Sequence, residues 1–445
     1  MDFDNIKRLF SLAAEKAGLE EYEVYYSAEE SVSTETLKHE ISNFSFSNTS
    51  GVSFRCVYNG KMGSASSELI NEATVWELVE RAMANAQVIE TDDEAIIFKG
   101  SEQYAELASV TPKLPDARDL RRVSLELEDK IYSESSMVVD GTQAAAASFV
   151  AERYLFNSHG LELFGRVGNS YVMANAVLNN GEESVEGFEV FGGVNEDILD
   201  EAAAKTVETA KEKLGAGRVK TGVYNVVFSD KQMCNLLSTF SPVFSAKNAM
   251  LGLSLLAGKE GTPVASECVN VTDDAMRDGI ALKTSFDGEG VATYRKSVIE
   301  NGVLKTLLYD LVTAGKSGKE STANGHRSGG SISIAPFCMC IEAGGYTLDG
   351  LFELAENGVY VTEMKGLHAG ADSVTGDFSI ECAGFLIENG KKTTPVKSFT
   401  VAGNFFTLLK NVIALSDKVR LPVAGGFTSF GSPAVLVGNM SVAGE

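Results

Sequence analysis

Side chains that commonly hold a catalytic metal are scarce in this chain. Its 445 residues include four histidines, His39, His159, His326 and His368, and no two of them lie three or four positions apart. A helix therefore cannot present two imidazoles on one face, which is the simplest way to begin a zinc site. The sequence predicts no metal ligands and no catalytic residues in this chain.

Two further patterns suggest chemistry, but each has a simpler interpretation. Cys338 and Cys340 alternate along a strand-like segment, so their thiols should share one face. Two thiols alone do not form a zinc site, and buried cysteine packs as a small hydrophobic residue. The Gly-Lys-Ser triplet at 315–317 resembles the end of a phosphate-binding loop, but Asp310 stands where that loop requires its first glycine. We expect core packing at the cysteines and no phosphate loop.

The densest polar pattern lies at residues 374–379. There Thr375, Gly376, Asp377 and Ser379 combine a turn former with small hydroxyl groups and one carboxylate. Glycine lets another backbone approach closely, and Asp377 can accept backbone N–H bonds. These residues either line a binding site or only shape tight turns around a sheet. Both interpretations stay open, because turns need the same residue types.

The charge balance argues against one class of function. The chain has 38 Lys and Arg against 61 Asp and Glu, a net charge of -23. Affinity for nucleic acid comes mostly from Lys and Arg, which release counterions from the phosphate backbone. We therefore expect no direct binding of nucleic acid.

Composition and the chain start favour a cytoplasmic globular protein. Residues 1–4 (MDFD) are acidic and are followed by no apolar signal region. No apolar run approaches the roughly 20 residues that a membrane span needs. The six cysteines have no regular spacing, so they do not describe a secreted disulfide framework. With 44% hydrophobic residues, the chain can bury two or three cores.

The first half predicts a helix–strands–helix unit that occurs twice. Strands are expected at about 22–66 and 137–191. Apolar residues at helical spacing predict helices at about 6–17, 71–86, 116–131 and 197–214. Residues 48–52 echo residues 157–161, and both read as hairpin turns with glycine at positive φ. The echo indicates either an internal duplication or merely two similar turns.

Glycines at 215–222 mark the clearest boundary and divide the chain into domains at 1–217 and 222–445. Beyond the boundary, Asn-Gly and Asp-Gly pairs at 287–288, 301–302 and 389–390 predict hairpins and antiparallel sheet. The helices expected here cover 230–240, 304–317, 347–357 and 405–415. The fold class is therefore α+β, with an N-terminal domain of helices and antiparallel strands and a hairpin-rich, mostly β C-terminal domain.

Several segments together carry a family resemblance. They are residues 321–324 (STAN), 374–379 (VTGDFS), 383–390 (AGFLIENG), 395–396 (PV), 401–404 (VAGN) and 440–444 (MSVAG). In order and spacing they resemble the signature of the TldD/PmbA family, the so-called modulators of DNA gyrase. One branch of that family carries a His-Glu-x-x-x-His metallopeptidase motif, and the PmbA or TldE branch does not. This chain has no histidine between His159 and His326, where the motif would fall, and no cysteine at 419–424, where a further ligand would stand.

The resemblance implies a metal-free subunit of the TldE/PmbA type. Such a subunit would pair with a TldD-like zinc-bearing partner, or with itself when alone, and help to enclose unfolded peptides for cleavage. The peptide cleft would include Asn324, His326, Arg327, His368, Thr375, Gly376, Asp377, Ser379 and Asn404. For the two histidines the simpler interpretation is polar loop residues. For the whole chain the alternatives are a stand-alone peptide-binding or regulatory protein, or an enzyme with an unorthodox active site.

Overall fold

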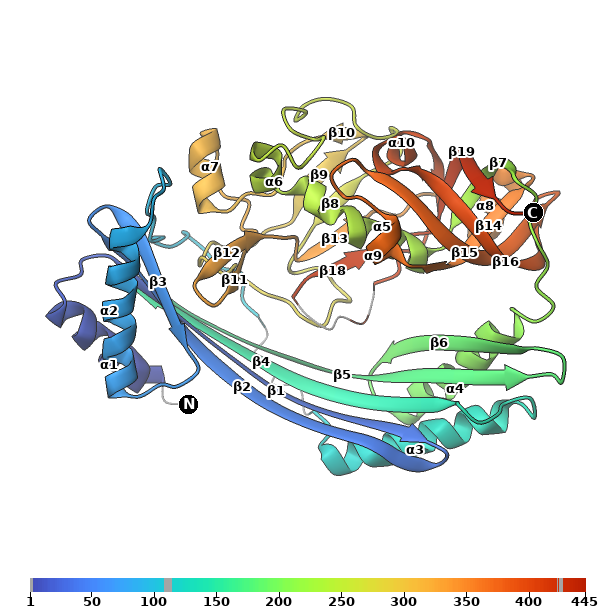
Figure 1. Ribbon diagram of the computed structural model, residues 1–445, viewed down its shortest axis with the longest axis horizontal. Helices are drawn as coiled ribbons and strands as arrows, with labels where there is room; N and C mark the ends of the chain where they lie inside the picture. Colours follow the sequence, from blue (N-terminus) through green and yellow to red (C-terminus); the bar gives the residue numbers. More distant parts are fainter. Residues whose placement is uncertain (1–2, 108–113, 422, 424–426) are drawn as a thin grey trace.

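The computed structural model describes residues 3–107, 114–421, 423 and 427–445 (Figure 1). Met1 and Asp2 of the acidic N-terminal segment, and Pro422 and Ala424 of the segment 419–424, lie outside this set. A long curved sheet with helices at both ends lies along one side of a strand-rich body. The α+β class is confirmed.

The first sheet is a six-stranded antiparallel sheet in the order β3-β2-β1-β4-β5-β6. Its strands are β1 (Tyr22–Leu37), β2 (Glu40–Tyr58), β3 (Lys61–Ser67), β4 (Gln143–Asn157), β5 (Glu162–Asn179) and β6 (Ser184–Gly192). The central strands are long, because β1 stays paired over nearly its whole length with β2 on one side and β4 on the other.

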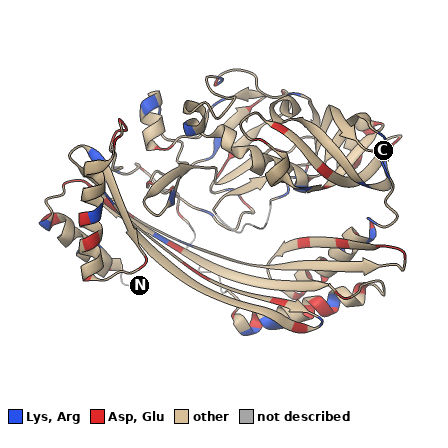
Figure 2. Cartoon of the chain, viewed as in Figure 1, with Lys and Arg blue, Asp and Glu red and all other residues tan. Residues whose placement is uncertain are grey.

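Four helices cover the two ends of this sheet: α1 (Phe3–Lys16), α2 (Glu72–Val88), α3 (Ala117–Glu134) and α4 (Glu196–Lys211). The side chains of Asn71, Asp116 and Asn195 cap α2, α3 and α4 by accepting backbone N–H bonds of the first turn. The predicted order of helix, strands and helix occurs twice. An ancient duplication stays a hypothesis. Acidic residues on these helices are interspersed with Lys and Arg (Figure 2).

The predicted hairpin turn at 48–52 is wrong. Gly51 lies inside β2, paired with Ser27 of β1, and the chain turns instead at Lys38 and His39, both with positive φ. Continuous pairing between two long strands outweighs the local turn preference of an Asn-Thr-Ser-Gly segment. The turn at 157–161 is confirmed, with Gly160 at φ 85, so the echo between the two segments does not reflect equivalent turns.

The C-terminal half contains two larger sheets and a hairpin. Their orders are β16-β15-β14-β7-β19-β17, β10-β9-β8-β13-β18 and β11-β12. Most neighbours are antiparallel, but β7–β14 and β13–β18 are parallel. The strands are β7 (Gly222–Phe228), β8 (Val271–Asp273), β9 (Lys296–Glu300), β10 (Val303–Leu304), β11 (Gly325–Ser328), β12 (Ser331–Ile334), β13 (Cys338–Ile341), β14 (Gly358–Lys365), β15 (Asp377–Glu388), β16 (Lys391–Asn404), β17 (Val412–Leu415), β18 (Ser429–Gly431) and β19 (Val435–Ala443).

Short helices connect these strands: α5 (Asp230–Phe240), the 3-10 helix η1 (Ser241–Phe244), α6 (Ala246–Met250), α7 (Leu311–Ser317), α8 (Leu348–Ala355), α9 (Leu367–Gly370) and α10 (Phe405–Lys410). Two expected helices are shorter than predicted. The helix expected at 304–317 begins only after its cap, Asp310, because Leu304 is paired in β10. The helix expected at 405–415 stops at Lys410, because 412–415 pair with β19.

The sheets separate along the chain, since the first uses strands before residue 193 and the others use strands after 221. The domain division at 217–222 itself stays a prediction. Among the described residues, no helix has the length and apolar character that crossing a bilayer requires.

Two glycines allow helices to lie directly on the first sheet. A Cβ added at Gly187 of β6 would lie 2.1 Å from the carbonyl oxygen of Thr206 in α4, and one at Gly63 of β3 would lie 1.9 Å from that of Ala82 in α2. We predict that Gly187→Ala destabilises the chain by about 1–3 kcal/mol, since backbone must move to admit the methyl group. Urea unfolding midpoints measure the effect.

Gly192→Ala is the matched control. It lies in the same strand, and its added Cβ would meet only Val423 Cγ2 at an ordinary 3.7 Å. Equal midpoints for the two variants would show that the close approach at Gly187 does not constrain the fold.

Candidate functional site

A buried ion network joins the first sheet to the loops of the C-terminal half. The side chain of Glu23 in β1 is completely buried and pairs with Arg327 of β11, whose side chain is also fully buried. Arg55 of β2 approaches the same carboxylate, with Nη2 3.2 Å from Glu23 Oε1. Charges removed from water need close partners, so this network fixes where β11 sits on the sheet.

The loop after β8 adds two carboxyl groups to this network. Asp287 accepts backbone N–H bonds from Glu289, Val291 and Gly325. Burial raises the pKa of Asp287 to about 6. Burial, and then the neighbouring Asp287, raise the pKa of Glu289 to about 8, so its carboxyl is largely protonated at neutral pH.

Hydrogen bonds of the Asn324 side chain hold the segment 321–327 in place. Asn324 Nδ2 donates to Asp273 Oδ2 at 2.7 Å and to the Ala335 carbonyl at 3.0 Å. Asp273 is fully buried and also pairs with Lys296 at 3.1 Å. Gly325 has no space for a side chain, since a Cβ there would lie 2.9 Å from Glu289 Oε2.

His326 and Arg327 then line a cavity of about 380 Å³ between the first sheet and β11. The His326 ring stacks on Phe337 with centroids 4.4 Å apart, and its Nε2 has no hydrogen-bond partner among the described residues. Burial lowers the pKa of His326 to about 4, so the ring is neutral at pH 7. Arg327 lies over the ring of Tyr25, and Arg153 over that of Phe427. The remaining lining residues are Ser27, Ala28, Glu29, Thr49, Ser50, Gly51, Glu68, Ala151, Glu152, Gly288 and Gly325.

The motif at 374–379 forms a tight turn that is tied to the end of β16. Asn404 Nδ2 donates to the Thr375 carbonyl at 2.8 Å and to Asp377 Oδ1 at 2.9 Å. The Asn404 side chain also accepts two N–H bonds as the cap of α10. Gly376 has φ 83, and a Cβ there would lie 2.6 Å from Phe406. These contacts hold the turn against β16 and α10, and the side chains of Thr375 and Asp377 are exposed.

His368 and Ser379 belong to this second region. His368 is exposed on α9, which packs against β15, and Ser379 is an exposed residue of β15. The structure thus places His326 and Arg327 at the cavity, with Asn324 buried beside them rather than lining it, and gathers the other six predicted residues around the start of β15. A single cleft shared by both groups stays a prediction.

The charged residues beneath the cavity, Glu23 and Arg55, lie outside the motifs that the sequence singles out. Glu23 stands between Tyr22 and Val24, and Arg55 between Phe54 and Cys56. A charged residue inside a run of bulky apolar strand residues is a signal for a buried ion pair, because its side chain must point into one of two covered faces. The pattern could have singled out the two residues without showing that they meet.

The residues in the region of the metallopeptidase motif do not fit zinc. Helix α5 buries Met233, Leu236, Leu237 and Phe240 in the core. Its one thiol, Cys234, is buried beside the Arg420 carbonyl, and burial raises its pKa to about 12, so it stays protonated. The expected face shared by Cys338 and Cys340 is confirmed, with the two Sγ atoms 3.5 Å apart in the core. Within the described ranges, no cluster of three His, Cys, Asp or Glu could hold a metal ion.

The neutral state of His326 predicts a pH-dependent stability. Because its pKa is about 4 in the folded chain and 6.5 when unperturbed, the unfolded chain binds more protons between these values. Stability from this group is present above pH 6.5 and is lost as pH falls towards 4. We predict that the free energy of unfolding falls between pH 7 and pH 5 by about 2 kcal/mol less in His326→Gln than in the parent chain. Urea unfolding at the two pH values measures the difference.

The exposed His368→Gln variant is the control for this experiment and should keep the parent's dependence on pH. A parent-like profile for His326→Gln would contradict the buried, neutral state of the ring.

Comparisons with known proteins agree with this architecture. Residues 221–444 match the PmbA/TldA metallopeptidase C-terminal domain, and residues 22–86 match PmbA/TldA metallopeptidase domain 1. A protein of Haemophilus influenzae, named a homolog of the metalloprotease PmbA, is 26% identical over 396 residues, which cover 86% of this chain and 84% of that protein.

Two solved structures have the same fold over nearly all of the chain. One is a Thermotoga maritima protein whose name presents it as a candidate modulator of a DNA gyrase. It has a TM-score of 0.89 at 27% sequence identity, and the match covers 99% of this chain and 100% of the Thermotoga chain. TldE from Thermococcus kodakarensis has a TM-score of 0.88 at 23% identity, covering 98% of this chain and 99% of its own. The chain therefore belongs to the PmbA/TldD family of metallopeptidase-like proteins.

Proposed function

We propose that this chain is a TldE/PmbA-type subunit that holds no zinc and works with a TldD-like, zinc-bearing partner in the proteolysis of unfolded peptides. The observation that carries the proposal is the loss of metal ligands from a family scaffold. No histidine lies between His159 and His326, and α5 turns Met233 and its apolar neighbours into the core. A catalytic zinc site needs about three converging protein ligands, so the chemistry must come from another chain.

The cavity beside His326 supports a role in holding peptide. Its floor includes Ser27 and Ala28 of β1 and Thr49 and Ser50 of β2, and His326 stands opposite on β11. The Nε2 atom of the neutral His326 ring has no partner among the described residues and can donate or accept one hydrogen bond, according to the tautomer, which suits a polar group of a peptide backbone. The site would therefore hold extended chains with little dependence on sequence.

The assembly belongs to the same proposal. The partner subunit and this chain would close a chamber between them, and two copies of this chain would pair about a twofold axis when the partner is absent. We place the assembly in the cytoplasm, without direct contact to nucleic acid or membrane. The alternative is a stand-alone peptide-binding or regulatory protein with no part in proteolysis.

Mixing the chain with a zinc-bearing relative tests the proposal. We predict that the chain alone holds far less than one zinc and cleaves no unfolded peptide. It should raise cleavage by the relative several-fold, because it completes the enclosure that holds substrate. Asp377→Ala should remove most of this gain if the exposed turn at 374–379 contacts peptide, which for a roughly fivefold gain is a loss approaching about 1 kcal/mol.

Asp140→Ala, which removes an exposed carboxylate from the first sheet region, serves as the matched control and should keep the gain. Cleavage that does not respond to the added chain would favour the stand-alone binding protein. About one tightly bound zinc per chain would contradict the metal-free assignment.

A further inference from the structure

A second cavity, of about 530 Å³, shares no lining residue with the cleft beside His326. It lies where α6, α7 and β12 approach the end of the first sheet (Figure 1). Seven apolar side chains line it, those of Met62, Ile89, Ile96, Met250, Leu251, Val312 and Ile332, together with seven charged ones, those of Arg55, Asp93, Glu94, Lys247, Glu289, Asp310 and Lys316. Small-molecule sites commonly combine apolar walls with polar groups that fix the orientation of the ligand.

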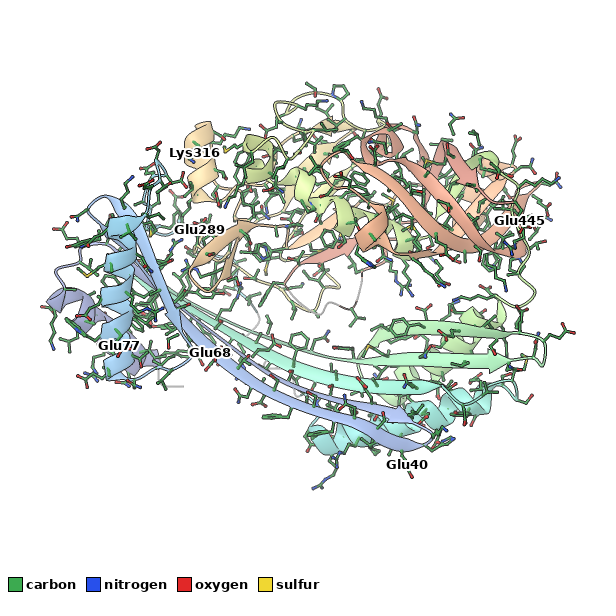
Figure 3. All side chains as sticks on the ribbon, viewed as in Figure 1. Glu40, Glu68, Glu77, Glu289, Lys316 and Glu445 are labelled. Carbon is green, nitrogen blue, oxygen red and sulfur yellow. The ribbon has the colours of Figure 1, made fainter. Side chains whose placement is uncertain are left out.

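Two carboxyl groups lie among the lining residues with unused hydrogen-bonding capacity. Glu289 is 2% exposed, and its Oε2 accepts the N–H of Leu311 at 2.9 Å. Its Oε1 lies 3.9 Å from Arg55 Nη1, too far for a hydrogen bond, and has no other partner among the described residues. Asp310 is 5% exposed, and its Oδ1 accepts hydrogen bonds from the backbone N–H and the hydroxyl of Thr313. Its Oδ2 has no hydrogen-bond partner among the described residues. Figure 3 shows Glu289 below the helix that carries Lys316.

The buried charges around this point are out of balance. Even with Glu289 protonated, the buried carboxylates of Glu23, Asp287 and Asp310 outnumber the two buried guanidinium groups, those of Arg55 and Arg327. Two lysines also line the cavity, but Lys247 is exposed and Lys316 pairs with Asp93. An anionic ligand would add to the excess of negative charge. Divalent cations such as Ca²⁺ take six or more oxygen ligands, which two carboxyl groups do not supply. A compact organic cation with an apolar stem matches both the charge and the walls.

We propose that this cavity binds a primary alkylammonium group. The ammonium donates hydrogen bonds to Glu289 Oε1 and Asp310 Oδ2, and its aliphatic stem lies along Met62, Ile96 and Val312. Three N–H donors on one small head suit two carboxylates that face the same space. The same chemistry occurs in free aliphatic amines and in the lysine side chain of a peptide.

Titration calorimetry of the full chain at pH 7 tests the proposal with hexylamine as the probe. We expect saturable binding at one site, and no binding of hexanoate. Glu289→Gln should weaken hexylamine binding at least tenfold, because it removes the charge that meets the ammonium. Glu90→Gln is the matched control. Glu90 is exposed and does not line the cavity, although its neighbours Ile89 and Thr91 do, so its variant should stay within about twofold of the parent.

Proton release gives a second readout that needs no variant. The charged groups around Glu289 are Arg55, Asp93, Glu94, Lys247, Asp287, Asp310 and Lys316. Since the pKa of Glu289 is raised to about 8, its carboxyl must lose a proton to pair with the ammonium. Binding at pH 7 should therefore release up to about one proton, seen as a heat that varies with the ionisation enthalpy of the buffer.

A blocked peptide, acetyl-Ala-Lys-Ala amide, distinguishes the two sources of the ammonium. Binding of this peptide at the hexylamine site assigns the cavity to a lysine side chain, and its failure assigns the cavity to free amines. The proposal is overturned if hexylamine does not bind, if Glu289→Gln binds it as well as the parent does, or if no proton is released. If Glu289→Gln does not fold, the proton release of the parent chain still decides the question.

Discussion

One buried carboxylate, that of Glu23, joins the two halves of this protein. It comes from the first sheet and meets Arg327 from β11 and Arg55 from β2, all three with side chains almost entirely removed from solvent. The network is incompletely satisfied, since Glu23 Oε2, Arg55 Nη2 and Arg327 Nη1 lack good hydrogen bonds among the described residues. Such a network contributes more to a unique arrangement than to net stability, because desolvation offsets most of the attraction.

Both cavities depend on this arrangement. Arg327 lines the cleft beside His326, and Arg55 lines the cavity that ends at Glu289. Each cavity takes one side from the first sheet and its flanking segments and the other from the loops around β11, β12 and α7. Neither surface exists unless the two halves are docked. The unusual protonation of His326 and Glu289 has the same origin, because docking excludes water from both groups.

The sequence was most informative where structure is decided locally. The helical spacing of apolar residues at 71–86 and 116–131 predicts α2 and α3 correctly, and the Asn-Gly pairs at 301–302 and 389–390 form the expected turns. It was wrong at 48–52, where pairing between β1 and β2 overrides a turn-like composition. Long-range pairing of this kind leaves no local trace in the residues that it overrides.

At the candidate site, too, the sequence predicts the local motif but not the contacts between residues far apart in the chain. The motifs pointed to Asn324, His326 and Arg327. The structure places His326 and Arg327 at one cavity and buries Asn324 next to them. The residues that hold them, Glu23 and Asp273, lie far away along the chain and carry no motif. Nothing in one sequence shows that Glu23 and Arg327 meet, because that contact is created by the docking of the sheet on the loops.

A double-mutant cycle between Glu23 and Arg327 tests this dependence most directly. The free energies of unfolding of the parent, Glu23→Gln, Arg327→Met and the double variant would be measured under one set of conditions. The account predicts that each single change is costly, by about 3–5 kcal/mol, because it leaves a buried charge unpaired. The double variant should recover at least about 1 kcal/mol of the summed loss. Effects that add within about 0.5 kcal/mol would show that the two side chains do not interact and that another contact joins the halves.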